Sequence, residues 1–402
     1  MNINYHYFTV KTLARFAGIE EAEAQYIAHF SQQVDDFIMS TPVAVKGNVP
    51  DFFKQNGLAK NITGNIWMFL PCPTGFELLS EVSHDYQRHA MVPFHFIPVE
   101  PLNTLENRSG FDRSLYRCLT AEDKKASLVN KLMETTVAKA DLKNAKSIME
   151  LGMMLHTYAD TYAHNSFSGF HGWENQSKIQ QAEKAKKPAL NELEIIAYTA
   201  LPSIGHANAG HTPDVCDYMI ALNLKKNEQS GLYPVITRDN SVFFTSCSAN
   251  ILGMLCKINK TEIPDDYKAK LRQITEAQVI KNELNAKETE RNWKKMFPNI
   301  KYHYNKEDYF ELQCKLELAY EKSIKSWGIT QKNLRDVYSP EGNRDRGKGA
   351  SVLSLEKVSS DFFDYNELAY RRVYAVTGEY ASTGRTEQLK DMAILLENLK
   401  IF

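Results

Sequence analysis

Apolar residues recur along much of this chain at the three- and four-residue spacing of amphipathic helices. The clearest run covers residues 20–39, where Ala24, Ile27 and Val34 fall on one face. Similar runs predict helices over residues 7–17, 121–162 and 240–257, and one or two more over 352–402. Helices are therefore expected to supply most of the regular structure.

Residues 42–114 lack this helical periodicity, because prolines and glycines interrupt every periodic run. We expect long connecting loops there, since alternating strand patterns are scarce along the chain. The predicted fold class is all-α, a helical bundle with long loops. The length of 402 residues suggests more than one domain, and we expect a first domain over 1–260 and a mainly helical C-terminal extension over 261–402.

Within that extension, charges of both signs alternate with apolar residues at helical spacing, most clearly over residues 309–327. This pattern predicts another helix with a solvated face. Residues 339–350 are rich in glycine and charge, which is typical of an exposed loop or linker.

Composition and charge exclude several protein classes. Hydrophobic residues make up 43% of the chain and charged residues 24%, as in ordinary globular proteins. The formal net charge is −1, so no broad positive field is available to bind nucleic acid non-specifically. A binding site for nucleic acid would have to be local, and nucleic acid is not the expected partner.

The chain contains no pattern typical of a membrane span or a Sec signal. The most apolar short run, residues 66–70, is far below the ~20 residues that cross a bilayer. The first residues lack a basic stretch followed by an apolar one. The 6 cysteines form no CxxC pair and are expected to be free thiols. We therefore expect either a cytoplasmic protein or one exported by a leader-independent secretion system.

The strongest chemical signal is the run His156, Asp160 and His164 on the predicted helix 121–162. Each step of four residues advances about 40° around a helix, so the three side chains lie within about 80° of one another. Small residues flank them on an apolar face, and three buried ionisable groups are costly without a partner. Nitrogen and carboxylate ligands suit a catalytic zinc site. The alternative is a set of polar residues that satisfy one another inside the bundle.

A second candidate site follows in the stretch SIGHANAGHTPD. His206 lies between glycines, and either His211 or Asp214 could complete a metal site with it. A glycine-rich turn with exposed histidines is the alternative. Asp35 is also a candidate, because it lies on the core-facing side of its helix and needs a metal ion or an arginine as partner.

The order of these residues resembles a known superfamily, the zinc-dependent phospholipases C and single-strand nucleases. The resemblance includes a histidine near the N-terminus, "SQQVDDF", a histidine within "FHF", "HTYADTYAHNSFSG" and "PSIGHANAGHTPD", and it covers roughly residues 5–260. These motifs are most similar to the bacterial zinc metallophospholipases C, which include leaderless secreted effectors.

The resemblance implies an all-helical fold around two or three zinc ions. It assigns zinc ligation to residues from across the first domain: His6, Asp35, His95, His156, Asp160, His164 and His206, with Asp214 or His211 as the last ligand. Asp35 and Asp160 would have catalytic roles, with Asp35 also orienting the attacking water. Secreted members begin with a Trp whose amino group binds zinc, and no Trp precedes His6 here, so a third ion is left open.

Three functions fit this reading. The first is a phospholipase C that releases diacylglycerol from phosphatidylcholine or phosphatidylglycerol at a membrane surface. The second is a single-strand nuclease or nucleotidase, which requires stacking platforms and local basic residues. The third is a non-catalytic, metal-stabilised helical binding protein. Arg88, Arg113 and Arg238 are candidates for holding phosphate, although surface or ion-pair roles are the ordinary expectation for each.

Overall fold

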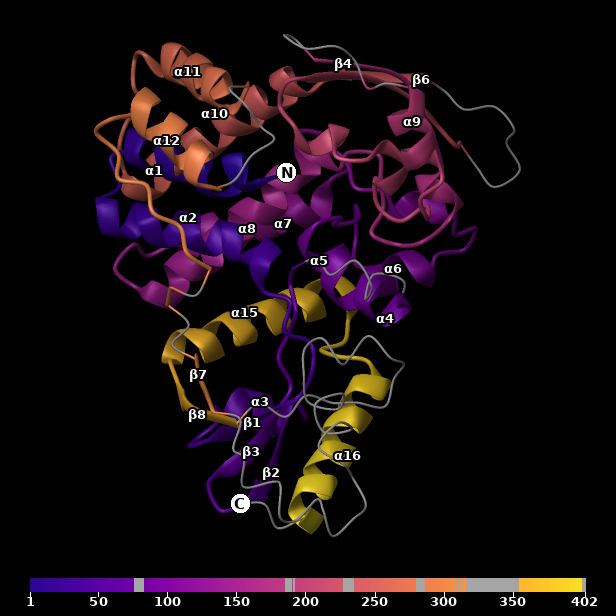
Figure 1. Ribbon diagram of the computed structural model, residues 1–402, viewed down its shortest axis with the longest axis vertical. Coiled ribbons are helices and arrows are strands. Elements are labelled where there is room, and N and C mark those ends of the chain that lie inside the picture. The colour runs from indigo at the N-terminus through magenta and orange to yellow at the C-terminus, as the bar shows by residue number, and fades with distance from the viewer. Residues whose placement is uncertain are drawn as a thin grey trace. The chain divides into compact units, whose positions relative to one another are not determined.

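The computed structural model describes the chain except for residues 76–82, 185–189, 191, 227–234, 280–285, 307, 310–311, 316–353 and 400–402. The chain forms two compact units (Figure 1). The first contains Met1–Asp36, Ser80–Lys306 and Val376–Gly378, and the second contains Phe37–Leu79, Glu307–Ala375 and Glu379–Phe402. Both units are discontinuous in sequence, so they do not follow the boundary expected near residue 260.

Two long helices, α2 (Glu21–Asp36) and α8 (Ala145–Ala163), pack along each other in the core of the first unit. Asn144 caps α8 by accepting a hydrogen bond from the Ser147 amide, which satisfies a free donor of the first turn. Gly152 allows the close approach, because a Cβ at this position would lie 2.5 Å from the Ile27 carbonyl oxygen. The side chains of α8 from Leu151 to Ala163 are all buried.

Other helices surround this pair. Helix α10 (Asn240–Asn259) packs against α8 and α1 (Val10–Phe16), and α7 (Ser127–Lys139) also packs against α8. The remaining helical elements of the first unit are η1 (Asn4–Thr9), α4 (His84–Tyr86), η2 (Gln87–Met91), α5 (Val92–Phe94), α6 (Leu102–Glu106), η3 (Arg113–Tyr116), η4 (Trp173–Asn175), α9 (Glu192–Thr199), η5 (Ala207–Ala209), η6 (Thr212–Asp214), α11 (Tyr267–Val279) and α12 (Ala286–Met296).

The first unit also contains an antiparallel sheet, in the order β4 (Ser177–Lys184), β5 (Tyr218–Leu224) and β6 (Val235–Asp239). In β5, Tyr218, Ile220, Leu222 and Leu224 are buried and alternate with more exposed residues. These four residues belong to a hydrophobic cluster of their own, together with residues of the segment that follows α8. The sheet therefore covers the part of the unit where α8 ends.

The second unit contains a five-stranded sheet in the order β2 (Ala59–Thr63), β3 (Ile66–Phe69), β1 (Val43–Lys46), β8 (Ser354–Val358) and β7 (Leu312–Lys315). Strand β1 pairs antiparallel with β3 and parallel with β8. Helices α3 (Asp51–Gln55), α15 (Ser360–Thr377) and α16 (Thr383–Leu399) accompany the sheet.

The prediction of an all-α fold is wrong, because both units contain a β-sheet and the protein is a mixed α/β structure. Part of the expected loop region, residues 42–114, forms β1, β2 and β3. These strands have only 4 or 5 residues each and are bounded by glycine or proline, so no periodic pattern develops along them.

The expected helices are confirmed, with adjustments. Residues 7–17 continue a π-helical turn into α1, and the long run over 121–162 is divided into α7 and α8. Two helices follow residue 352, as expected. Of residues 309–327, the structure describes only 309 and 312–315, and 312–315 form β7, while the predicted loop 339–350 lies outside the described residues.

By length and composition, α10 is the single described helix that could cross a membrane. Its side chains at Ile251, Leu252 and Leu255 are fully buried in the hydrophobic core of the first unit. A core helix passes the same test of length and hydropathy, so the described residues contain no clear transmembrane segment.

Candidate metal centre

Helix α8 positions three of the candidate ligands. His156, Asp160 and His164 lie one turn apart near its C-terminal end and are buried, with relative exposures of 0%, 0% and 5%. The apolar face of α8 draws this part of the helix into the core, and the four-residue spacing keeps the three polar groups on one side. The structure thus brings together the three residues of the strongest sequence signal.

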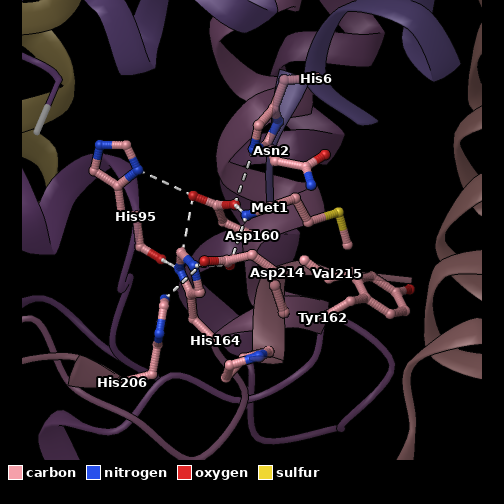
Figure 2. A network of polar contacts seen from close by, with 12 residues as sticks. Met1, Asn2, His6, His95, Asp160, Tyr162, His164, His206, Asp214 and Val215 are labelled. Atoms are coloured by element: carbon pink, nitrogen blue, oxygen red, sulfur yellow. Dashed lines mark hydrogen bonds and ion pairs between the residues drawn. The ribbon is translucent and has the colours of Figure 1, made fainter. Parts of the chain in front are cut away.

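Asp160 is at the centre of the cluster (Figure 2). Its Oδ2 lies 3.0 Å from His95 Nδ1 and 3.2 Å from His156 Nε2. Its Oδ1 lies 3.1 Å from His6 Nε2. The two carboxylate oxygens therefore face different sets of nitrogen atoms.

Backbone carbonyls fix the orientation of three rings. Nδ1 of His156 lies 2.7 Å from the carbonyl oxygen of Ser31 on α2. Nδ1 of His164 lies 2.7 Å from the His95 carbonyl, and Nδ1 of His206 lies 2.7 Å from the Gly210 carbonyl. A ring that donates from Nδ1 is left with an unprotonated Nε2, and such partners commonly orient metal-binding histidines.

His6 comes from the π-helical segment η1, a helix type that is frequent at functional sites. Its ring is fully buried and stacks on the His156 ring with 3.7 Å between centroids. Among the described residues, neither ring nitrogen of His6 has a hydrogen-bond partner of acceptable geometry. Because a buried polar atom is costly when unsatisfied, a metal ion would remove this cost.

Asp35 lies at the end of α2, farther from the centre of the cluster. Its Oδ1 is 3.7 Å from His156 Nε2 and 3.8 Å from His95 Nδ1, distances that leave room for an ion between them. The side-chain amide of Gln32 donates to Asp35 Oδ2 at 3.3 Å. Burial raises the pKa of Asp35, while the neighbouring histidines His156 and His95 act in the opposite direction.

The loop over residues 206–214 supplies the last ligands. Asp214 Oδ2 lies 3.1 Å from His206 Nε2, and Asp214 Oδ1 lies 3.1 Å from His164 Nε2. His211 does not join this group: its Nδ1 contacts the Tyr198 hydroxyl at 2.8 Å and its Nε2 lies 3.4 Å from the Tyr218 hydroxyl. The sequence left His211 and Asp214 as alternatives, and the geometry groups Asp214 with the other ligands.

The amino group of Met1 is a member of the cluster that sequence reasoning missed. It lies 2.5 Å from Asp160 Oδ1 and 3.2 Å from Asp214 Oδ1, between the two carboxylates (Figure 2). No ligand residue type marks this amino group in the sequence, because it belongs to the backbone of Met1.

The charges of the cluster shift several pKa values. Burial lowers the pKa of the Met1 amino group, but the carboxylates of Asp160, Asp214 and Asp35 outweigh burial and raise it to about 11. Burial tends to raise the pKa of Asp160, but the surrounding histidines and the amino group hold it well below its ordinary range. Burial, aided by His156, lowers the pKa of His6.

Part of the cluster is exposed to solvent. The side chains of Asp35, Asp214 and His206 are 26%, 21% and 16% exposed, whereas Asp160 is 1% exposed. These three ligands are therefore more accessible to solvent than the central carboxylate.

Each candidate arginine has a partner in the structure. Arg88 pairs with Glu106, Arg113 pairs with Glu174, and Arg238 donates to backbone carbonyls of α8.

Three groups of side chains have ligand atoms close enough to hold a metal ion: His6, His156 and Asp160; Asp35, His95 and His156; and His164, His206 and Asp214, each within 4.8 Å. The donors are nitrogen and oxygen atoms without thiolate, and among the described residues neither ring nitrogen of His6 has a hydrogen bond of acceptable geometry. The residues therefore fit a cluster of metal ions.

The sequence profile of one family matches residues 1–380 of the chain, nearly its whole length. The chain belongs to the DUF6765 family, a family of unknown function. No curated protein and no solved structure matches it. The family assignment spans both units, and the chemistry has to be argued from the cluster itself.

Proposed function

We propose that this protein is a zinc-dependent phosphodiester hydrolase that acts as a phospholipase C on glycerophospholipids such as phosphatidylcholine or phosphatidylglycerol. The observation that supports it most is the convergence of three ligand groups around Asp160, with His6 buried and, among the described residues, without a hydrogen bond of acceptable geometry at either ring nitrogen. A closed structural zinc site has four ligands, and the larger set here favours a multinuclear catalytic centre.

Two or three zinc ions would be held by the grouped residues, with the Met1 amino group as a further nitrogen donor. Zinc lowers the pKa of a bound water to about 7 and neutralises charge on phosphoryl oxygens, so no protein nucleophile is required. Zinc is favoured over magnesium because imidazole supplies most of the donors.

The two catalytic aspartates and the backbone carbonyls around the cluster would have different roles in this hydrolysis. Asp160, buried and surrounded by nitrogen atoms, would be the central carboxylate ligand. Asp35 is partly exposed and accepts a hydrogen bond from Gln32, and it would orient the attacking water and accept its proton. The carbonyls of Ser31, His95 and Gly210 keep three imidazoles in the required tautomer.

The absence of basic residues along the segment that carries His206 and Asp214 favours a lipid substrate over a polynucleotide. A nuclease attracts a polyanion with basic residues and holds bases on aromatic platforms. Residues 192–214, which carry two of the ligands, include no Lys or Arg. A phospholipid needs only one phosphate at the metal ions and an apolar surface for its acyl chains.

The test compares substrates with the zinc-loaded full-length protein. Vesicles of phosphatidylcholine, vesicles of phosphatidylglycerol and single-stranded DNA are incubated separately, with Asp160→Ala as the blank. Asp123→Ala, which removes an exposed carboxylate elsewhere in the first unit, is the control. We expect diacylglycerol release by the wild type and the control, and none by Asp160→Ala. Release of nucleotides without diacylglycerol would replace the phospholipase with a nuclease, and no hydrolysis of any substrate would overturn the proposal.

A further inference from the structure

Helix α9 and the turn after it expose an apolar stripe in the first unit. Leu193, Ile196 and Leu201 have relative exposures of 78%, 63% and 45%, and Ala197 and Ala200 are also exposed. Their spacing, i, i+3, i+4, i+7 and i+8, is that of one face of a helix. A helix in a soluble protein usually buries such a face, so its exposure indicates an interaction surface.

The opposite side of α9 is fixed to the loop that carries His206 and Asp214. Tyr198 contacts His211 through its hydroxyl group, and its ring lies so close to Gly210 that a Cβ there would be 2.5 Å away. The side-chain amide of Asn208 donates to the carbonyl oxygens of Tyr198 and Leu201. The apolar stripe is therefore attached directly to the loop that carries two partly exposed candidate ligands, His206 and Asp214.

The charge of residues 192–214 limits which class of partner could bind the apolar stripe. Residues 192–214 contain Glu192, Glu194 and Asp214 and no basic residue. This segment therefore offers no Lys or Arg to a polyanion or to an anionic membrane, which attracts both residue types. A zwitterionic lipid surface does not depend on basic residues for binding, and its apolar interior can take up the apolar stripe.

The size of the apolar stripe distinguishes a protein partner from a lipid surface. Three large apolar side chains amount to an exposed patch of roughly a few hundred Å², whereas a stable protein interface buries about 800 Å² on each partner. Side chains that enter the boundary of a bilayer need no complementary protein surface. A lipid surface therefore fits the stripe better than a second copy of this chain.

We propose that α9 docks the protein onto the surface of a zwitterionic phospholipid bilayer, with Leu193, Ile196 and Leu201 entering the apolar boundary. This inference rests on the proposed function, because it explains how a phosphate in a bilayer reaches the metal centre. The loop of residues 206–214 then lies at the membrane surface, and the accessible ligands face the headgroups.

The experiment measures flotation of the full-length protein with phosphatidylcholine vesicles, without requiring turnover. The test variant carries Leu193→Glu and Ile196→Glu, and the control carries Val242→Glu, because Val242 is 62% exposed on another helix. We expect the test variant to float at least about tenfold less than the wild type, since two apolar side chains leave the boundary. The control is expected to float like the wild type.

The possible results of this experiment distinguish docking by α9 from the proposed hydrolytic activity. Equal flotation of wild type and test variant would overturn docking by α9, whatever the hydrolytic activity. Flotation that depends on α9, without hydrolysis of any phosphodiester, would support docking and refute the proposed function. Stronger, salt-sensitive flotation on vesicles that contain phosphatidylglycerol would contradict the zwitterionic surface, and an α9-dependent dimer in size-exclusion chromatography would assign the stripe to a second copy.

Discussion

Asp214 and His211 differ in what they contact, although only two residues separate them. Asp214 faces His206 and His164, whereas His211 lies between the hydroxyl groups of Tyr198 and Tyr218. We therefore expect His206→Ala to lower zinc affinity by about 10- to 100-fold or more, as the loss of even an outer partner does. His211→Ala is expected to retain the full zinc content. Metal analysis of both dialysed variants checks this, and loss of zinc in His211→Ala would contradict the assignment.

The Met1 amino group predicts a pH dependence of metal binding. Its pKa of about 11 lies above the ordinary value of 8.0, so the metal-free protein carries an ammonium group at pH 7. Zinc must displace this proton, so zinc affinity rises with pH, by about tenfold per unit for one proton, until the pH approaches the raised pKa.

Calorimetry in two buffers of different ionisation enthalpy measures the protons released when zinc binds. A chain acetylated at Met1 is expected to release about one proton fewer than the unmodified chain. Equal proton release by the two chains would show that the amino group does not bind zinc.

At this scale the sequence predicted the residues that share one element. His156, Asp160 and His164 follow from helical spacing alone, and in the structure both histidines contact the Asp160 carboxylate. The positions of His6 and His95 depend on long-range packing, which spacing does not encode. The amino group of Met1 has no side-chain signature at all, so a search for ligand residue types could not find it.

At the scale of elements, the spacing between α2 and α8 sets the geometry of the cluster. A methyl group at residue 152 would meet the Ile27 carbonyl oxygen at 2.5 Å, and backbone atoms cannot move aside cheaply. Gly152→Ala gains about 1 kcal/mol of helix propensity but forces the helices apart at a cost of about 1–3 kcal/mol. We expect a net loss of stability and weaker zinc binding, because Ser31 and Asp35 move away from His156.

Gly253 on α10 provides the matched control. A Cβ there would meet only the Ile263 Cδ1, at 3.9 Å, which is ordinary van der Waals contact. Gly253→Ala is therefore expected to stabilise the protein by up to about 1 kcal/mol. Denaturant titration of both variants compares the free energies of unfolding, and a stabilising Gly152→Ala would contradict the close packing.

The strands show where sequence reasoning at this scale was insufficient. The alternation of Tyr218, Ile220, Leu222 and Leu224 was readable as a strand and was overlooked beside the stronger helical pattern. The pairing of β1 with β8 was not readable, because the two strands lie about three hundred residues apart in the chain. A long helix can be predicted from the local sequence pattern, whereas a strand pairing also depends on a distant segment of the chain.

For the whole molecule, the family profile spans both units, while the candidate centre lies in the first. Residues from η1, α2, the segment after α5, α8 and the loop before β5 all contribute to it. Because these residues are adjacent only in the folded chain, metal ions held by them would bind the native state and stabilise it. The account therefore depends on whether the intact protein binds metal ions at this cluster.

Metal analysis of the dialysed full-length protein tests this central claim most directly. After incubation with zinc, the wild type is expected to retain at least two zinc ions per chain. Asp160→Ala, which lacks the carboxylate at the centre of the cluster, is expected to retain less than one. A wild-type chain that retains no zinc, or an Asp160→Ala chain that retains as much as the wild type, would contradict the account.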